Sequence, residues 1–220
     1  MLKNIFFDLD GTLINHFSAI LRCINLALSR LKRKPLSKKD YAPFVGSTLK
    51  QLANAIVGHG DDCDEFCRLY VDAIDATFQD GLVELRGAKW ILSELERSGY
   101  AIAIFTNKRR FLAEKICHLL GFDAHLKAIV ATDGESEELR KPSERFSKIA
   151  LESIGAKAAE SAMVGDTETD FQAALSGNFA KCYLVTTGMR GAEELVSSGV
   201  EEENIFPDLL SLGKKAFGLN

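Results

Sequence analysis

The sequence alternates short apolar segments with amphipathic helical patterns, and this alternation limits the fold more than any other feature. The apolar segments are rich in β-branched residues and end in polar residues or glycine, as buried strands do. Helical patterns lie between them, for example residues 87–99, which stop at Gly99, and residues 108–121, which stop at Gly121. Strand and helix in repeated alternation predict an α/β fold with a doubly wound, parallel, Rossmann-like sheet. The expected strands span residues 4–9, 100–108, 126–133, 161–166 and 181–188.

Residues 15–84 interrupt this alternation with three helical patterns and no clear strand. The patterns cover residues 16–34, 46–58 and 62–80. We therefore expect two domains: an α/β core catalytic domain made of residues 1–14 and 85–220, and an inserted helical cap, or lid, made of residues 15–84. Ligands bind beyond the carboxyl ends of the strands in such sheets. Since the insert leaves the core at that edge, we expect the cap to cover the same region.

Composition excludes several classes of function. The net charge of −4 gives no general attraction to nucleic acid or anionic lipid, so neither is an expected partner. No apolar run approaches the roughly 20 residues needed to span a bilayer, and the first residues lack the pattern of a signal peptide. We expect a cytoplasmic protein that is a monomer or a small homo-oligomer. The five cysteines are scattered; only Cys63 and Cys67 are close, and no second ligand pair follows them at zinc-site spacing.

Polar residues gather at the expected strand ends. A doubly wound sheet brings these ends together even when they are far apart in sequence. A lone lysine stands before a proline, which biases it towards an extended conformation. The residues expected to face one pocket are Asp8, Asp10, Thr106, Asn107, Lys141, Asp166 and Asp170.

These residue types predict phosphoryl chemistry. Clustered carboxylates repel one another unless a cation lies among them, and oxygen ligands favour a hard ion such as Mg²⁺. Lys141 supplies a second positive charge, and a phosphoryl group fits between the two. The Thr106 hydroxyl and the backbone amides after Asp8 would then bind its oxygens.

The spacing of Asp8 and Asp10 indicates a division of roles. Asp8 ends an apolar strand and is held rigidly enough to attack phosphorus in line, forming an aspartyl phosphate. Residues i and i+2 project to the same side of a strand, so Asp10 reaches the leaving oxygen if the Gly11 turn bends it over the site. Asp10 would protonate the leaving alcohol and then activate water.

Four motifs in this order resemble those of the haloacid dehalogenase superfamily: "FFDLDGTL", the hydroxyl residue in "IFTNK", "KP" at Lys141, and "GDTETD". More narrowly, the chain resembles the phosphoglycolate phosphatase-like members, which carry a helical cap between the first two motifs. The resemblance implies a Mg²⁺-dependent phosphatase. Its implied site residues are the nucleophile Asp8, the acid and base Asp10, the phosphate-binding Thr106, Asn107 and Lys141, and the metal ligands Asp8, Asp10 through its carbonyl, Asp166 and Asp170. Asp170 is a ligand through water or a partner of Lys141.

The chain departs from the family pattern after "DGTL", where Asn15 and His16 follow Ile14. His16 and Phe17 are therefore candidates for substrate contact. The segment "FVGSTLKQL" resembles the cap loop that approaches the substrate. Its candidate specificity residues are Gly46, Ser47, Thr48 and Lys50.

Three other functions compete with that of a phosphatase. A dehalogenase proper has no use for an acid at Asp10. A sugar phosphomutase of the same lineage stays possible, although such relatives tend to carry a cap histidine where this chain has Ile20. A phospho-accepting signalling module combines similar residues in about half this length and without a large lid. The sequence predicts a small phosphorylated metabolite, phosphoglycolate-like or a sugar phosphate, but does not name it.

Overall fold

The computed structural model describes residues 1–132 and 136–220. These residues form two compact units. The core unit comprises Met1–Asn15 and Glu84–Asn220, and the inserted unit comprises His16–Val83. The chain passes between them at two short paired strands, β2 (Ile14–Asn15) and β3 (Val83–Glu84).

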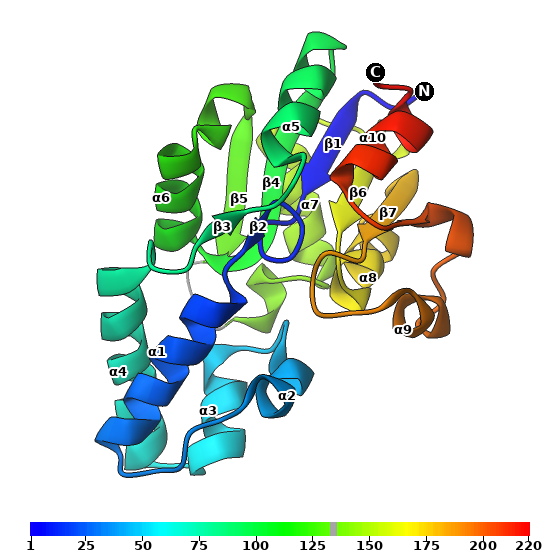
Figure 1. The fold of residues 1–220 in the computed structure, drawn as a ribbon. Helices are drawn as coiled ribbons and strands as arrows, with labels where there is room; N and C mark the ends of the chain where they lie inside the picture. Colours follow the sequence, from blue (N-terminus) through cyan, green and yellow to red (C-terminus); the bar gives the residue numbers. More distant parts are fainter. Residues whose placement is uncertain (133–135) are drawn as a thin grey trace. The chain divides into compact units, whose positions relative to one another are not determined.

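In the described part of the core unit, six strands form one sheet in the order β5-β4-β1-β6-β7-β8 (Figure 1). Every pairing given for this sheet is parallel, which confirms the doubly wound α/β class. β8 was not predicted, because two residues are too few for a periodic signal. The last residue of the third expected strand, Asp133, lies outside the described residues. The strands are β1 (Asn4–Phe7), β4 (Ala101–Arg109), β5 (Ala128–Thr132), β6 (Ser161–Gly165), β7 (Lys181–Val185) and β8 (Ile205–Phe206).

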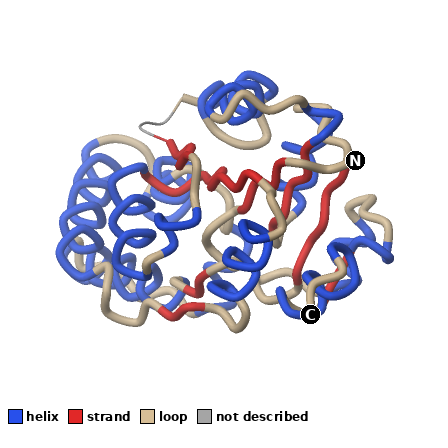
Figure 2. The backbone as a smooth tube through the Cα atoms, turned by 90° about the horizontal axis from the view of Figure 1, so that it is seen from above, coloured by secondary structure: helices blue, strands red, loops and turns tan. Residues whose placement is uncertain are grey.

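Helices lie on both sides of the row of strands (Figure 2). On one face, Phe6, Phe105 and Met163 from the strands form a buried cluster with Phe146 of α7 and Ala173 of α8. Parallel strands covered on both faces need apolar side chains throughout, which explains why β1 has no exposed position. The core helices are α5 (Ala88–Arg97), α6 (Arg110–Leu120), α7 (Glu144–Ser153), α8 (Glu168–Ser176), α9 (Ala192–Ser197) and α10 (Leu209–Phe217).

The inserted unit is helical. α1 and α3 both pack against α4, and Ile24, Leu28, Phe66 and Ile74 of α1 and α4 are fully buried. The short α2 was not predicted from periodicity; a capping box between Ser37 and Asp40 starts it. The α-helices described in this unit are α1 (Phe17–Arg30), α2 (Lys38–Tyr41), α3 (Leu49–Val57) and α4 (Asp61–Thr77).

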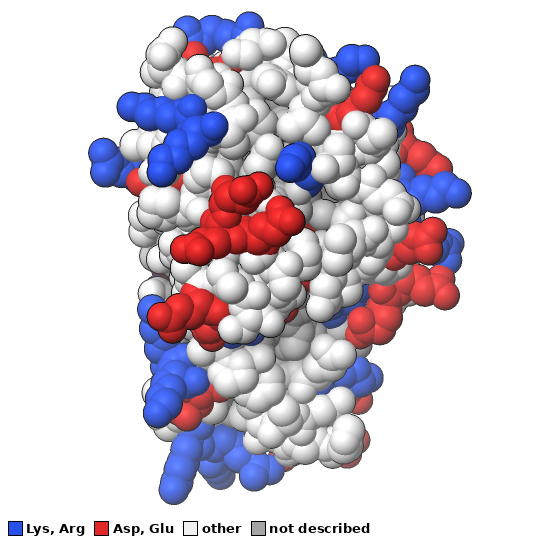
Figure 3. All heavy atoms as spheres, turned by 90° about the vertical axis from the view of Figure 1, so that its right-hand side faces the viewer, with Lys and Arg blue, Asp and Glu red and all other residues white. Residues whose placement is uncertain are grey.

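Two surface properties bear on partners. Among the described helices, none is both long enough and apolar enough to cross a membrane. Acidic side chains gather on the face of the core unit that carries α9 and the 3-10 turn η5 (Glu202–Asn204) (Figure 3). An open recess there is lined by Glu201, Glu202 and Glu203. This face repels anions, so the local cations described below have to attract an anionic ligand.

Candidate active site

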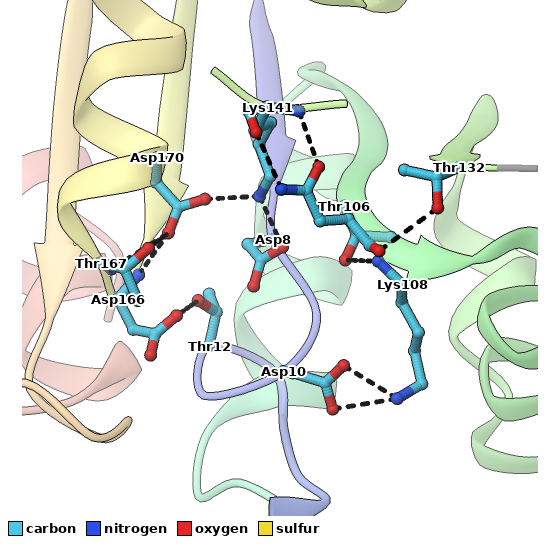
Figure 4. A network of polar contacts seen from close by, with 11 residues as sticks. Asp8, Asp10, Thr12, Thr106, Lys108, Thr132, Lys141, Asp166, Thr167 and Asp170 are labelled. Atoms are coloured by element: carbon cyan, nitrogen blue, oxygen red, sulfur yellow. Dashed lines mark hydrogen bonds and ion pairs between the residues drawn. The ribbon is translucent and has the colours of Figure 1, made fainter. Parts of the chain in front are cut away.

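The carboxyl ends of three neighbouring strands bring the expected residues together (Figure 4). Asp8 follows β1, Thr106 lies near the end of β4, and Asp166 follows β6. β1 pairs with β4 on one side and β6 on the other, with Phe7 opposite both Ile104 and Val164. This register aligns the three ends, and all three polar side chains are buried.

Lys141 links two of the carboxylates. Its Nζ lies 2.6 Å from Oδ1 of Asp8 and 2.5 Å from Oδ1 of Asp170, and its side chain is 3% exposed. Burial opposes the charged ammonium, but Asp170 and Asp8 outweigh this effect and raise the pKa of Lys141 above its ordinary value. Burial raises the pKa of Asp8 to about 6, although Lys141 acts against it. Of the two roles that the family resemblance implied for Asp170, the structure shows the partner of Lys141.

Asp170 also organises the start of α8. Its Oδ2 accepts hydrogen bonds from the backbone amides of Asp166 and Thr167, at 3.1 and 3.0 Å, and from the Thr167 hydroxyl at 2.9 Å. Its carboxylate packs so closely on Gly165 that a Cβ there would lie 2.3 Å from Asp170 Cγ. Both oxygens of Asp170 therefore already have partners, and the residue fixes the loop that carries Asp166.

Asp166 is the carboxylate whose hydrogen bonds are least complete. Its Oδ1 accepts a long hydrogen bond of 3.5 Å from Thr12, and its Oδ2 is buried without a hydrogen-bond partner in the described structure. Burial, together with Asp170 and Asp8, raises the pKa of Asp166 well above its ordinary value. A Cβ at Gly11 would lie 2.2 Å from this Oδ2, and one at Gly188 would lie 1.7 Å from it. Two glycines thus make room for this oxygen.

Three carboxylates of the site lie close enough together to bind one metal ion. Carboxylate oxygens of Asp8, Asp166 and Asp170 lie within 4.8 Å of one another, the one such cluster of metal-binding side chains found in residues 1–132 and 136–220. A buried oxygen without a donor, next to two further carboxylates, is stabilised by a cation. Since all three donors are oxygens, the site fits a hard divalent cation. Asp170 is the least suitable of the three as a metal ligand, because its oxygens already accept hydrogen bonds from Lys141 and from the start of α8.

Asp10 lies apart from the Asp8–Lys141–Asp170 cluster in Figure 4. Its two carboxylate oxygens lie 3.1 and 2.8 Å from Nζ of Lys108. Gly11 adopts a φ of +89° directly after Asp10, which turns the chain as the sequence analysis expected. The Thr187 hydroxyl donates a hydrogen bond of 2.7 Å to the Gly11 carbonyl and fixes this turn.

Thr106 and Asn107 occupy different positions in the site. Thr106 is 2% exposed, and its hydroxyl accepts a hydrogen bond of 3.2 Å from the backbone amide of Lys108. The Asn107 side chain bonds to the main chain of Lys141 instead of lying free in the pocket. The structure thus gives Asn107 a supporting contact that the sequence analysis did not foresee.

The candidate specificity residues all belong to the inserted unit. His16, a candidate for substrate contact, is fully buried, and its Nε2 lies 2.7 Å from the Phe78 carbonyl oxygen. Phe17 is 8% exposed in the same unit. A buried imidazole bonded to the backbone has its polar group satisfied within the helical unit.

The candidate specificity residues of the cap loop differ in their contacts. Thr48 caps α3 through a capping box with Gln51, and the Ser47 hydroxyl donates to the Phe44 carbonyl. Gly46 has a φ of +90°, which serves the turn. Gly46 and Lys50 are the exposed members of the set, and Lys50, 3.9 Å from Asp64, is the one that carries a charge with which to meet an anionic ligand.

Sequence reasoning missed four contributors to the site. Lys108 was predictable from its position, since it lies two residues after Thr106 and therefore projects to the same side of the strand. Thr12, Thr187 and Gly188 carry no such signal, because their approach to the site depends on loop paths rather than on periodicity.

A doubly wound sheet with a buried lysine between carboxylates, and with a carboxylate cluster that fits a cation, has the features that phosphoryl transfer uses. Comparison with known families is decisive here: the model of the haloacid dehalogenase-like hydrolases matches residues 5–182, so the chain belongs to that family. The resemblance stated from the sequence motifs is confirmed.

Named relatives cover most of the chain. It is 30% identical over 192 residues to pyrophosphatase PpaX from Bacillus velezensis, covering 87% of this chain and 86% of that protein. It is also 30% identical over 190 residues to a plasmid-encoded phosphoglycolate phosphatase from Cupriavidus necator, covering 84% and 80%.

Solved structures agree on the fold. A predicted phosphatase from Clostridium acetobutylicum matches with a TM-score of 0.86 and 26% identity over 100% of both chains. CbbY from Rhodobacter sphaeroides, solved in complex with xylulose-(1,5)bisphosphate, matches with a TM-score of 0.81 over 97% of each chain. Its identity of 19% shows a shared fold alone.

Proposed function

We propose that the protein is a Mg²⁺-dependent phosphatase that hydrolyses a small phosphate monoester through an aspartyl phosphate on Asp8. One observation carries the proposal: Lys141 binds Asp8 at 2.6 Å, while a buried Asp166 oxygen in the same carboxylate cluster has no donor in the described structure. A nucleophilic carboxylate thus lies between a fixed cation and a place for a second one, as phosphoryl transfer requires.

The reaction proceeds in two balanced steps. An oxygen of Asp8 attacks phosphorus, and the bond from phosphorus to the leaving oxygen breaks while Asp10 gives that oxygen its proton. Water then attacks the phosphorus of the aspartyl phosphate and gives a proton to Asp10, which releases inorganic phosphate and restores the Asp8 carboxylate. Asp10 thus serves as acid and then as base, and the net change is addition of water to the ester.

The other residues hold and neutralise the phosphoryl group. Lys141 and the Thr106 hydroxyl bind its oxygens, and Asn107 acts through its bonds to the Lys141 main chain. Asp8, Asp166 and the Asp10 carbonyl would hold Mg²⁺, with Asp170 acting at most through water. A bound Mg²⁺ supplies positive charge that offsets the clustered carboxylates and polarises a phosphate oxygen.

The names of the relatives support a small anionic substrate. Phosphoglycolate phosphatase and pyrophosphatase are both named among them, and a related fold was solved with a sugar bisphosphate. We assign substrate preference to the inserted unit, with the exposed Lys50 as the first residue to test and Gly46, Ser47 and Thr48 as the frame of its loop.

Steady-state turnover of a panel of phosphate esters, with Mg²⁺ and with a chelator, tests the proposal. We expect multiple turnovers with Mg²⁺, loss of activity with the chelator, and loss of activity in Asp8→Asn with the fold retained. Asp123→Asn, an exposed change outside the site, should match the parent protein. A single stoichiometric phosphorylation without turnover would instead indicate a phospho-accepting module, and transfer of phosphate to a second sugar hydroxyl would indicate a phosphomutase.

A further inference from the structure

Lys108 is a buried cation in the site for which the two-step scheme gives no role. Its side chain is 5% exposed, while that of its partner Asp10, 98 residues away in sequence, is 20% exposed. The ammonium lies 3.1 and 2.8 Å from the two Asp10 oxygens and therefore bridges both. A pair this little exposed is screened less by solvent than a surface salt bridge.

The backbone directs Lys108 towards Asp10. The pairing of β4 with β5 changes register between Phe105 and Arg109, so the strand is irregular at Lys108. The Lys108 amide is bonded to the Thr106 hydroxyl at 3.2 Å, which fixes the local main chain. Irregularities of this kind redirect side chains and are common next to active sites.

The two lysines of the site pair with different carboxylates. Asp8 and Asp170 share Lys141, and Asp166 is the expected metal ligand. Lys108 contacts the one carboxylate that has to move a proton in the proposed reaction. A pair placed for stability alone has no reason to select that residue.

We propose that Lys108 is the positioning residue for Asp10: its ammonium holds the carboxyl group in the orientation from which the leaving oxygen receives its proton. This inference rests on the proposed function, because it presupposes Asp10 as the acid. Lys108 keeps its own protons throughout, and the proton passes from Asp10 to the leaving oxygen as that oxygen separates from phosphorus.

The choice of substrate separates this role from a structural one. An alkoxide leaves poorly without a proton, whereas a nitrophenolate leaves without one. The constant kcat/KM reports steps only up to departure of the leaving group, so the later reaction with water does not enter it. If Asp10 is no longer held in the correct orientation, kcat/KM falls for an alkyl phosphate but stays the same for an aryl phosphate. General damage to the site lowers kcat/KM for both substrates.

The test compares glycerol 2-phosphate with p-nitrophenyl phosphate, both with saturating Mg²⁺. We expect Lys108→Met to lower kcat/KM for the alkyl ester about ten- to a hundred-fold, a large part of what general acids contribute, and to change that for the aryl ester by less than about three-fold. Lys108→Arg keeps a cation at this position and should restore most of the alkyl activity. Lys148→Met, an exposed lysine on α7, should leave both esters unchanged.

Asp10→Asn distinguishes the two possible failures. If Asp10→Asn shows the selective loss but Lys108→Met lowers both esters equally, or neither, the positioning role is wrong and the proposed function stands. If Asp10→Asn itself leaves alkyl turnover intact, the proposed function fails first. Circular dichroism and thermal unfolding of each variant identify a misfolded protein, and in that case Lys108→Arg decides: alkyl activity no better than that of Asp10→Asn, in a folded protein, overturns the inference.

Discussion

The side chain of Asn107 is hydrogen-bonded to both main-chain groups of Lys141. Its Oδ1 accepts from the Lys141 amide at 2.6 Å, and its Nδ2 donates to the Lys141 carbonyl at 3.0 Å. One carboxamide thus hydrogen-bonds to both the amide and the carbonyl of a loop residue, as a neighbouring strand does for a residue in a sheet. The base of the Lys141 side chain is fixed to the end of β4, which also carries Thr106.

Loss of this contact should impair catalysis more than folding. We expect Asn107→Ala to lower kcat/KM about ten-fold or more, because small displacements of a charged group in the site are costly in rate. Asn204→Ala, which removes a carboxamide on η5, is the matched control. Steady-state kinetics and urea unfolding measure both effects. A parent-like rate in Asn107→Ala would show that Lys141 does not depend on this contact.

Metal binding should appear as a change in thermal stability. An ion that binds only the folded state at a hundred times its Kd adds about 2.7 kcal/mol, or roughly 5–10 °C in Tm for a chain of this size. We expect Mg²⁺ to raise the Tm of the parent protein but not that of Asp166→Asn. In chelator, Asp166→Asn should have the higher Tm of the two, since it removes a buried carboxylate. An equal Mg²⁺ response in both proteins would contradict the assignment of Asp166.

Without metal, stability should fall as the pH rises. Burial raises the pKa of Asp8 to about 6 and that of Asp166 well above its ordinary value, so the folded state binds more protons than the unfolded state in this range. Stability then decreases with pH, because its slope follows the difference in bound protons.

We therefore expect the Tm in chelator to drop between about pH 5 and pH 7, through the raised pKa of Asp8. Lys141, which faces Asp8, stays charged in this range because its pKa is raised above its ordinary value. The lowered pKa values of exposed carboxyls such as Asp40 and Glu160 act at lower pH. Thermal unfolding across this range measures the slope, which Asp166→Asn should reduce and Mg²⁺ should abolish. A metal-free Tm that rises with pH would exclude this account.

Gly188 leaves no room for a methyl group beside Asp166. A Cβ at Gly188 would lie 1.7 Å from Asp166 Oδ2, so Gly188→Ala has to displace the carboxylate or the loop. We expect a higher Mg²⁺ concentration for half-maximal activity and a kcat at least about ten-fold lower. Gly191→Ala is the control from the same loop, because its Cβ would meet its nearest atom at 3.7 Å and its φ is −82°. Similar kinetics in both variants would show that the site tolerates the displacement.

The parts predictable from sequence are those governed by periodicity. Asp8 and Asp166 meet because they follow adjacent parallel strands, and the alternation of strand and helix was enough to place them. The two-residue β8 and the four-residue α2 are too short to leave a pattern. Gly188 was not foreseen because the loop that brings it to Asp166 follows no repeat, whereas the spacing of Lys108 from Thr106 was sufficient to predict it. The burial of His16 could not be read from the sequence either, because its imidazole is bonded to the Phe78 carbonyl, 62 residues away.

The contact of Thr187 with the Gly11 carbonyl joins segments separated by 176 residues. The match to the family model ends at Cys182, before this contact is reached, although every residue assigned to the chemistry lies within it. Asp170, the last of the residues assigned to the chemistry, precedes Thr187 along the chain, so the turn behind Asp10 is fixed only after all of these residues have been synthesised. Contacts between distant segments form late because closing a long loop costs entropy. We therefore expect the turn behind Asp10 to be among the last parts of the site to form, after the strands that carry Asp8 and Asp166 have paired.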